Sequence, residues 1–205
     1  ALGPNRDALA ERNAPERDGP GRASEDEAVV LVSGGLGLVY LPLSPERLTL
    51  EQISESHPRL LDTLSAHPGV GFVMVRSRVH GALVIGGGGC RHLADDTVEG
   101  ADPLAHFDPT AAEHLRRHDQ FPHCPDILVN CMYDPAADEV APFEEFMGSH
   151  GGLGGPQTHP FAVIPNEWSD PPAPIVGVEA MHAQLMDWVE QSRHRGRGEA
   201  RSTVE

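Results

Sequence analysis

The sequence predicts an α/β fold in which a mixed sheet with hairpins is flanked by helices. Short aliphatic runs bounded by glycine or proline alternate with segments whose apolar residues recur near a 3.6-residue period. At least two pairs of the short runs are close enough in sequence to form hairpins, which favours a partly antiparallel sheet over a uniform βαβ array. The 205 residues, 39% of them hydrophobic but only 5% aromatic, are enough for one aliphatic core.

Composition divides the chain into three parts. Residues 1–27 are rich in Pro, Gly, Arg and Glu and hold few large apolar groups, so we expect a disordered lead-in or linker. Residues 28–191 carry the periodic patterns and form the ordered portion. The arginine-rich segment 192–205 is predicted to be a disordered tail.

The first ordered elements are two strands that form a hairpin. Residues 28–32 are a continuous aliphatic run typical of a buried strand, and a second strand is predicted at 36–41, where Pro42 stops it. Ser33, Gly34 and Gly35 between them suit a tight turn. A dinucleotide-binding glycine motif is excluded, because Tyr40 stands where its third glycine would be and a strand follows instead of a helix.

Residues 49–66 have a helical pattern. Thr49 and Gln52 make a capping box, and Pro58 is expected to divide the segment by starting a second short helix. The clearest hairpin follows, with strands at 70–75 and 82–85 around a charged turn and a glycine loop at 86–89 after it.

The second half of the ordered portion has four predicted elements. They are a short helix at 109–117, a buried strand at 126–133, a short terminal strand at 162–165 and an amphipathic helix at 178–191 with Met181, Leu185, Met186 and Trp188 on its apolar face.

Charge and composition exclude several functions. A formal charge of −16 disfavours binding to nucleic acid or to an anionic membrane surface. All 15 basic residues are arginine, so a Walker A loop and a Schiff-base lysine are absent. The three cysteines have no CxxC spacing, which argues against a zinc knuckle, and no apolar run approaches the ~18 residues of a membrane span.

The stretch 148–161 is the most distinctive part of the sequence. It packs five glycines, two prolines and two histidines into fourteen residues. Glycine permits positive φ and close approach of the backbone to a ligand, and His150 in such a loop can offer a neutral imidazole nitrogen to a metal or a phosphate-like group. The alternative is a tight surface turn with one polar side chain.

Other candidate constellations are weaker. His114 and His118 have the i, i+4 spacing of helical metal ligands but lack the glutamate of HExxH, so a solvated helix face is the expected alternative. The Asp-x-x-x-His spacing occurs twice, at Asp102/His106 and Asp119/His123, and so means little by itself. A serine hydrolase is disfavoured because no Gly-x-Ser-x-Gly elbow exists.

The block Gly148 to Thr158 resembles the C-terminal metal-ligand loop of the alkaline phosphatase superfamily, in particular its type I phosphodiesterase/nucleotide pyrophosphatase branch, as found in bacterial proteins with an N-terminal membrane segment. Supporting similarity runs through four further pieces within residues 28–170: 30–34, 67–72, 102–104 and 121–122. The resemblance implies the C-terminal part of an alkaline phosphatase-like layered fold, incomplete in this chain.

In that family two zinc-type ions activate a Thr or Ser nucleophile for in-line phosphoryl transfer. The resemblance implies that His150 is a zinc ligand. The other ligands, the nucleophile and the Asp-His-Gly motif of the family precede this region in chain order. In this chain no aspartate is followed directly by a histidine, so Asp-His-Gly is absent and no catalytic residue is assigned. The alanine at position 1 likewise suggests that something has been removed upstream. Completion of a site by Asp102 and His106 with His150 is disfavoured by their place in chain order.

The sequence therefore predicts the C-terminal portion of a metal-dependent phosphoric ester hydrolase. It would supply one ligand to a divalent metal pair, bind no metal tightly alone and show negligible turnover without the missing N-terminal part of the same domain. Its substrate-binding residues and cellular location are not predicted. Two alternatives stay open: a non-catalytic acidic α/β binding module, and a full-length relative that has kept the fold and lost catalysis.

Overall fold

The structure is a computed structural model that describes residues 27–145, 148–171 and 173–202, with the side chains of residues 156 and 193–202 outside the description. The predicted lead-in 1–27 therefore lies almost wholly outside the described residues. The chain forms two compact units, Ala1–His159 and Pro160–Glu205, and the boundary falls inside the range 28–191 that composition marked as the ordered portion. No helix among the described residues has both the length and the apolar character needed to cross a bilayer.

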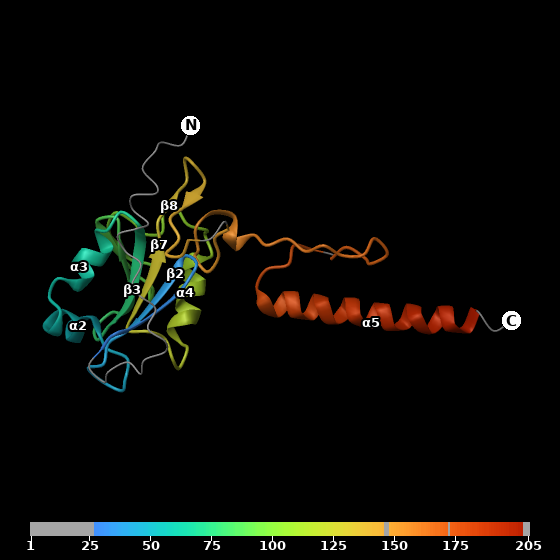
Figure 1. The fold of residues 1–205 in the computed structure, drawn as a ribbon, viewed down its shortest axis with the longest axis horizontal. Coiled ribbons are helices and arrows are strands. Elements are labelled where there is room, and N and C mark those ends of the chain that lie inside the picture. The colour runs from blue at the N-terminus through green and yellow to red at the C-terminus, as the bar shows by residue number, and fades with distance from the viewer. Residues whose placement is uncertain (1–26, 146–147, 172, 203–205) are drawn as a thin grey trace. The chain divides into compact units, whose positions relative to one another are not determined.

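The first unit is an α/β fold, as predicted, built on a seven-stranded sheet with the order β1-β2-β7-β3-β4-β5-β6 (Figure 1). Every pairing between its described strands is antiparallel, so the predicted mixed sheet is corrected to an antiparallel one. Its strands are β1 (Val29–Ser33), β2 (Leu36–Tyr40), β3 (Val70–Ser77), β4 (Gly81–Gly86), β5 (Gly89–His92), β6 (Val98–Gly100) and β7 (Ile127–Cys131).

Strands β7 and β3 form the buried centre of the sheet. All five residues of β7 are buried, as its apolar run predicted. Alternate residues of β3 point to opposite faces: Phe72 and Met74 belong to one core cluster, whereas Val73 and Val75 belong to the other. The sheet is therefore covered by a hydrophobic layer on each face of its centre.

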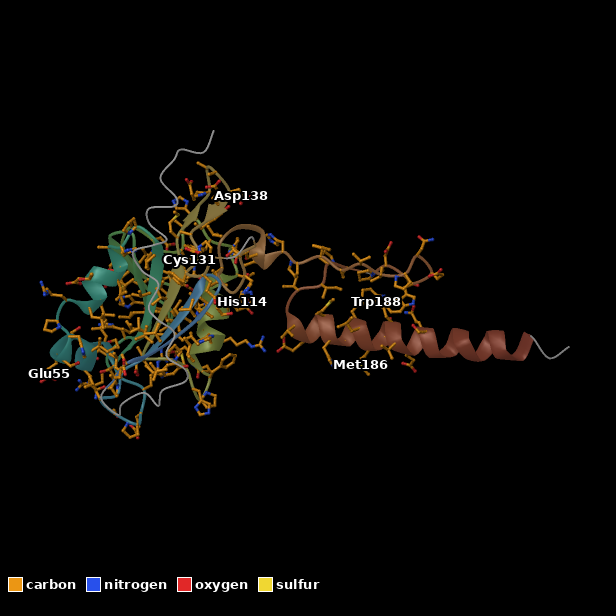
Figure 2. The ribbon with its side chains drawn as sticks, viewed as in Figure 1. Glu55, His114, Cys131, Asp138, Met186 and Trp188 are labelled. Carbon is orange, nitrogen blue, oxygen red and sulfur yellow. The ribbon has the colours of Figure 1, made fainter. Side chains whose placement is uncertain are left out.

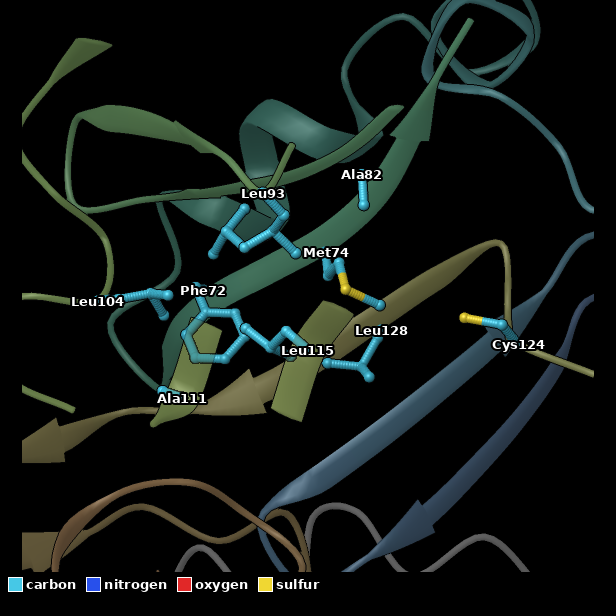
Figure 3. Close-up of a cluster of buried hydrophobic side chains, with 10 residues drawn as sticks. Phe72, Met74, Ala82, Leu93, Leu104, Ala111, Leu115, Cys124 and Leu128 are labelled. Carbon is cyan, nitrogen blue, oxygen red and sulfur yellow. The ribbon is translucent and has the colours of Figure 1, made fainter. Parts of the chain in front are cut away.

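The helices cover the two faces separately. Ile53 of α2 (Leu50–Ser56) and Leu61 of α3 (Leu60–Ser65) join the cluster of Val73. Ala111 and Leu115 of α4 (Ala111–Asp119) join the cluster of Phe72 on the other face, as Figure 3 shows. In Figure 1, α2 and α3 accordingly lie on one side of the sheet and α4 on the other.

Local signals account for the helix boundaries. Thr49 caps α2, and the capping box with Gln52 is present as predicted. Pro58 interrupts the helical segment but does not start the second helix, which begins two residues later at Leu60. The reason is that Pro58 and Arg59 form a turn, in which the amide of Leu60 donates to the carbonyl oxygen of His57 at 3.0 Å.

Strand β1 departs from its predicted environment. The hairpin with β2 is confirmed, and Ser33 pairs with Leu36 across the predicted turn. The expected burial is wrong, because all five β1 residues are exposed. Its only neighbour among the described strands is β2, so β1 stands at the edge of the sheet.

Four short strands were not predicted as separate elements from the sequence. Strands β5 and β6 continue the meander after the turn at Gly87 and Gly88, where only a glycine loop was expected. A small second sheet pairs β8 (Tyr133–Asp134) with β9 (Glu139–Val140). These strands are short, and their sequences lack the alternating aliphatic pattern on which prediction depended.

The second unit consists of an extended segment and helix α5 (Val178–Ser202). The strand predicted at 162–165 is not present, and these residues have no regular secondary structure. The backbone of α5 continues past Ser192, where a disordered tail was expected, to Ser202. Trp188 is buried as predicted and its indole Nε1–H donates to the carbonyl oxygen of Ser169, whereas Leu185 and Met186 are exposed in place of lining a core.

Candidate functional site

His150 lies against the β1–β2 turn, at the end of the sheet where β1 and β7 finish and β2 and β3 begin. The main-chain amide of Gly35 donates to the carbonyl oxygen of His150 at 2.6 Å. The side chain of His150 is exposed. The backbone that carries the imidazole is therefore fixed to the sheet at a residue that is exposed.

Two glycines make this close contact possible. Gly34 has φ +57°, and a Cβ atom built on it would lie 2.2 Å from the carbonyl oxygen of His150 and 2.9 Å from its Nδ1. Gly151 has φ +81°, and its Cβ would lie 2.3 Å from the carbonyl oxygen of Ser33. Both positions therefore require glycine for conformation and for space. The sequence suggested close approach of this backbone to a ligand, whereas the approach that the structure shows is to the protein's own β1–β2 turn.

Strand β7 supports the same loop from beneath. Asn130 is 1% exposed, and its Oδ1 accepts a hydrogen bond from the amide of Leu153 at 3.0 Å. Its Nδ2 donates to the carbonyl oxygen of Cys131 at 2.9 Å. Cys131 (Figure 2) is buried, which raises the pKa of its thiol, and its Sγ would be only 2.7 Å from a Cβ on Gly35. A buried amide thus ties the histidine loop to the central strand.

A carboxylate lies at the same turn. The amide of Gly34 donates to Oε2 of Glu144 at 2.5 Å, and the amide of Phe143 donates to the carbonyl oxygen of Gly34 at 2.8 Å. Glu144 is half-buried. The turn therefore holds the segments before and after residues 146–147, and it brings one carboxylate and one imidazole to the residue Gly34.

The rest of the glycine-rich stretch is held by its own short contacts. Residues Gly155–Thr158 form a 3₁₀ turn, in which Gln157 Nε2 donates to the carbonyl oxygen of Gly154 at 2.9 Å. The Nε2 atom of His159 lies 3.3 Å from a carboxylate oxygen of Asp108. Hydrogen bonds from Thr110 hold the pKa of Asp108 below its ordinary value, with a smaller contribution from His159. The second histidine of the stretch is therefore an exposed residue whose ring lies beside the carboxylate of Asp108.

The two histidines at i, i+4 on α4, His114 and His118, have different environments. His114 (Figure 2) is exposed, whereas His118 is half-buried and stacks on Phe121 with ring centroids 5.2 Å apart. Burial lowers the pKa of His118, and the positive charge of Arg47 lowers it further. His114 has the environment of the solvated-face alternative that the sequence left open, whereas His118 is partly buried.

The two Asp-x-x-x-His aspartates are held by arginines. Asp102 accepts from Arg91 Nε at 3.1 Å and from Nη2 at 2.5 Å, and these bonds hold its pKa below the ordinary value. Asp119 is buried between Arg47, at 2.5 Å, and Arg76, at 3.2 Å. Their histidine partners, His106 and His123, are exposed. Both aspartates thus belong to salt bridges that connect elements of the fold.

No group of three or more His, Cys, Asp or Glu side chains that could hold a metal occurs among the described residues. At the β1–β2 turn the donors that the fold assembles are His150 and, bound to the amide of Gly34, Glu144. Sequence reasoning identified His150 but missed Asn130 and Glu144. The one available signal for Asn130 was a polar residue in the middle of an aliphatic strand.

Comparisons with protein-family models, with curated proteins and with solved structures found no match to this chain.

Proposed function

We propose that this chain is the C-terminal portion of a metal-dependent phosphoric ester hydrolase of the alkaline phosphatase-like kind, and that His150 supplies one ligand of its metal centre. The observation that carries the proposal is the set of hydrogen bonds that fix the loop around His150. Its main chain is hydrogen-bonded to the β1–β2 turn, the loop beyond it is anchored by buried Asn130, and its imidazole is exposed. A side chain that ligates a metal has to be held in place by its surroundings in this way.

The loop lies at the end of the sheet where β1 and β7 finish and β2 and β3 begin. Because the sheet is antiparallel, both of its ends carry carboxyl ends of strands, so this position does not by itself mark a ligand site. The resemblance to the phosphodiesterase branch implies a metal site there, and the chemistry of the proposal rests on His150.

The described residues supply one ligand of a metal site, His150, and not a complete site. A catalytic zinc has about three protein ligands, whereas the described residues contain no group of three possible ligands. The other ligands and the nucleophile would come from a preceding part of the same domain. A bound divalent metal pair would supply positive charge to a phosphoryl group in transfer, and this chain would hold His150 in place.

The non-catalytic binding module is favoured by a separate observation. Strand β1 exposes four aliphatic side chains at the sheet edge, as a surface for another polypeptide would. A binding module needs the exposed strand but has no need of His150, so substitution of His150 separates the two functions.

The test uses the longer protein in which this chain follows its upstream segment. His150→Ala should lower the zinc stoichiometry and reduce hydrolysis of a nitrophenyl phosphodiester by at least about 100-fold, the upper end of what is lost when a residue that only supports a metal ligand is removed. His123→Ala is the matched control, because His123 is also exposed but is distant in sequence from the glycine-rich loop. Unchanged zinc stoichiometry and hydrolysis in His150→Ala would disprove the proposal.

A further inference from the structure

Strand β1 has an unusually exposed run of aliphatic side chains. Val29, Val30, Leu31 and Val32 are 41, 58, 52 and 40% exposed. Successive residues of a strand point to opposite faces, so β1 presents two partly exposed aliphatic side chains on each face of the sheet. These side chains lie beside the edge of the strand that faces away from β2.

The two edges of the sheet differ in a way that singles out β1. At the opposite edge, β6 has three residues, includes Glu99 and ends in Gly100 at φ +75°. Short length, charge and irregular backbone are the devices by which proteins protect an edge strand from pairing. From Val29 to Val32, β1 has none of them. It is five residues long and, within that run, carries no charge, proline or glycine.

The helical layers stop short of β1. The two core clusters include residues of β2, β3, β4 and β7, together with α2 and α3 on one face and α4 on the other. No residue of β1 belongs to either cluster or is packed against it. Among the described residues of the first unit, β1 pairs with β2 alone and packs against neither core cluster, which is the environment of an internal strand whose other neighbours are missing.

We propose that β1 is an internal strand of a larger sheet, and that its outer edge pairs with a strand from a layered α/β segment preceding this chain in the same polypeptide. The inference rests on the proposed function, because that function requires an upstream part of the domain. The segment must bring a strand for the free edge and apolar elements for the two bare faces.

A second copy of the chain does not meet these requirements. Pairing β1 with the β1 of another copy would satisfy the edge, but both strands would keep their exposed aliphatic faces, since the helices packed on the sheet of the first unit do not extend to β1 in either copy. Residues 1–26 are also poor candidates by composition, because Leu2 and Leu9 are their only large apolar side chains.

The geometry connects this docking edge to His150. β1 ends at Ser33, whose carbonyl oxygen lies against Gly151, and the next residues carry the turn that holds His150. A strand paired with β1 therefore ends or begins beside the imidazole. The same segment that covers β1 would bring its own side chains to the incomplete metal site.

Hydrogen exchange tests the docking edge directly. In the 205-residue chain, the outward amides of residues 29–33 should exchange freely. In the longer protein they should exchange at least about tenfold more slowly, because strand pairing protects them. Val30→Glu and Leu31→Glu, one on each face, should abolish that protection, whereas Val79→Glu in the exposed β3–β4 turn should leave it unchanged.

Three results would overturn the inference. One is equal exchange in both proteins. Another is protection in the 205-residue chain that depends on protein concentration, which would identify a second copy as the occupant. The third is protection in that chain that disappears when residues 1–24 are deleted, which would identify its own N-terminal segment.

The docking edge and the metal ligand can fail separately. If His150→Ala lowers zinc stoichiometry in the longer protein but residues 29–33 remain unprotected, the proposed function stands and this inference falls. If residues 29–33 are protected but His150→Ala leaves the zinc stoichiometry unchanged, β1 pairs with another strand in a protein that is not the proposed metalloenzyme. That outcome contradicts the proposed function and removes the metal-site part of the inference.

Discussion

The amide of Gly35 donates a 2.6 Å hydrogen bond to the carbonyl oxygen of His150. This bond joins two glycine-rich turns that are far apart in the sequence, and each turn contains a residue at positive φ, Gly34 and Gly151. The backbone of His150 is therefore positioned by the protein itself. The main chain of His150 is already ordered before a ligand binds the imidazole, which lowers the entropic cost of binding.

Gly34→Ala should displace the histidine loop. A Cβ at this position requires a non-glycine residue at φ +57° and a contact of 2.2 Å with the carbonyl oxygen of His150. Gly81→Ala is the matched control, because Gly81 has φ +71° but nothing within 4 Å of its Cβ. We expect a loss of about 1–2 kcal/mol in the control from backbone strain alone, and a clearly larger loss in Gly34→Ala. Urea unfolding measures both, and equal losses would contradict the contact.

Asn130→Ala should loosen the same loop from beneath. The substitution leaves the amide of Leu153 without its acceptor and removes a donor to Cys131 in a fully buried position. We expect a loss of roughly 1–3 kcal/mol and faster hydrogen exchange at the Leu153 amide. Asn166→Ala, at an exposed turn, should change neither quantity. Unaltered exchange at Leu153 in Asn130→Ala would show that the loop is held by other contacts.

Much of the fold was predictable because its signals are local. The capping box of Thr49 and Gln52, the turn at Gly34 and Gly35, and the aliphatic run of β7 each depend on a few adjacent residues. Those elements were identified within a few residues of their observed bounds. The position of His150 in a constrained glycine loop was predictable for the same reason.

The rest depended on contacts between distant segments. An aliphatic run predicts a strand, but the exposure of Val30 and Leu31 depends on which neighbours the strand has. The role of Asn130 follows from Leu153, and that of Glu144 from the amide of Gly34, and neither pair is adjacent in sequence. Spacing within one segment carries no information on such pairs.

Glu51 should make stability depend on acidic pH. Burial opposes ionisation of Glu51, but hydrogen bonds from the amide of Arg78 and the hydroxyl of Ser77 outweigh it and lower its pKa to about 2. A pKa that is lower in the folded state stabilises the fold above the ordinary value of 4.5, and this contribution disappears as pH falls toward about 2.

The difference in unfolding free energy between the wild type and Glu51→Gln should therefore be constant above about pH 5 and shrink below it. Chemical unfolding at a series of pH values measures the difference. Glu55→Gln, at an exposed position of the same helix, is the control. A difference that stays constant down to pH 3 would contradict the assignment of these hydrogen bonds to the ionised carboxylate.

Asp126→Ala should be the most destabilising of these changes. One buried carboxylate accepts the amide of Leu41 through Oδ2 at 2.7 Å and the amide of Leu48 through Oδ1 at 2.6 Å, and so ties both ends of the loop between β2 and α2 to the start of β7. Its removal leaves two buried amides without acceptors, for an expected loss of roughly 3–5 kcal/mol.

Asp126→Asn sharpens the test, because it keeps the shape but turns one acceptor into a donor that faces an N–H group. It should therefore recover less than half of that loss. Asp134→Ala, which removes a single bond to the exposed amide of Ala136, should cost under about 1 kcal/mol. Urea unfolding of the three variants checks the order, and an asparagine variant as stable as the wild type would mean that only one of the two amides depends on the carboxylate.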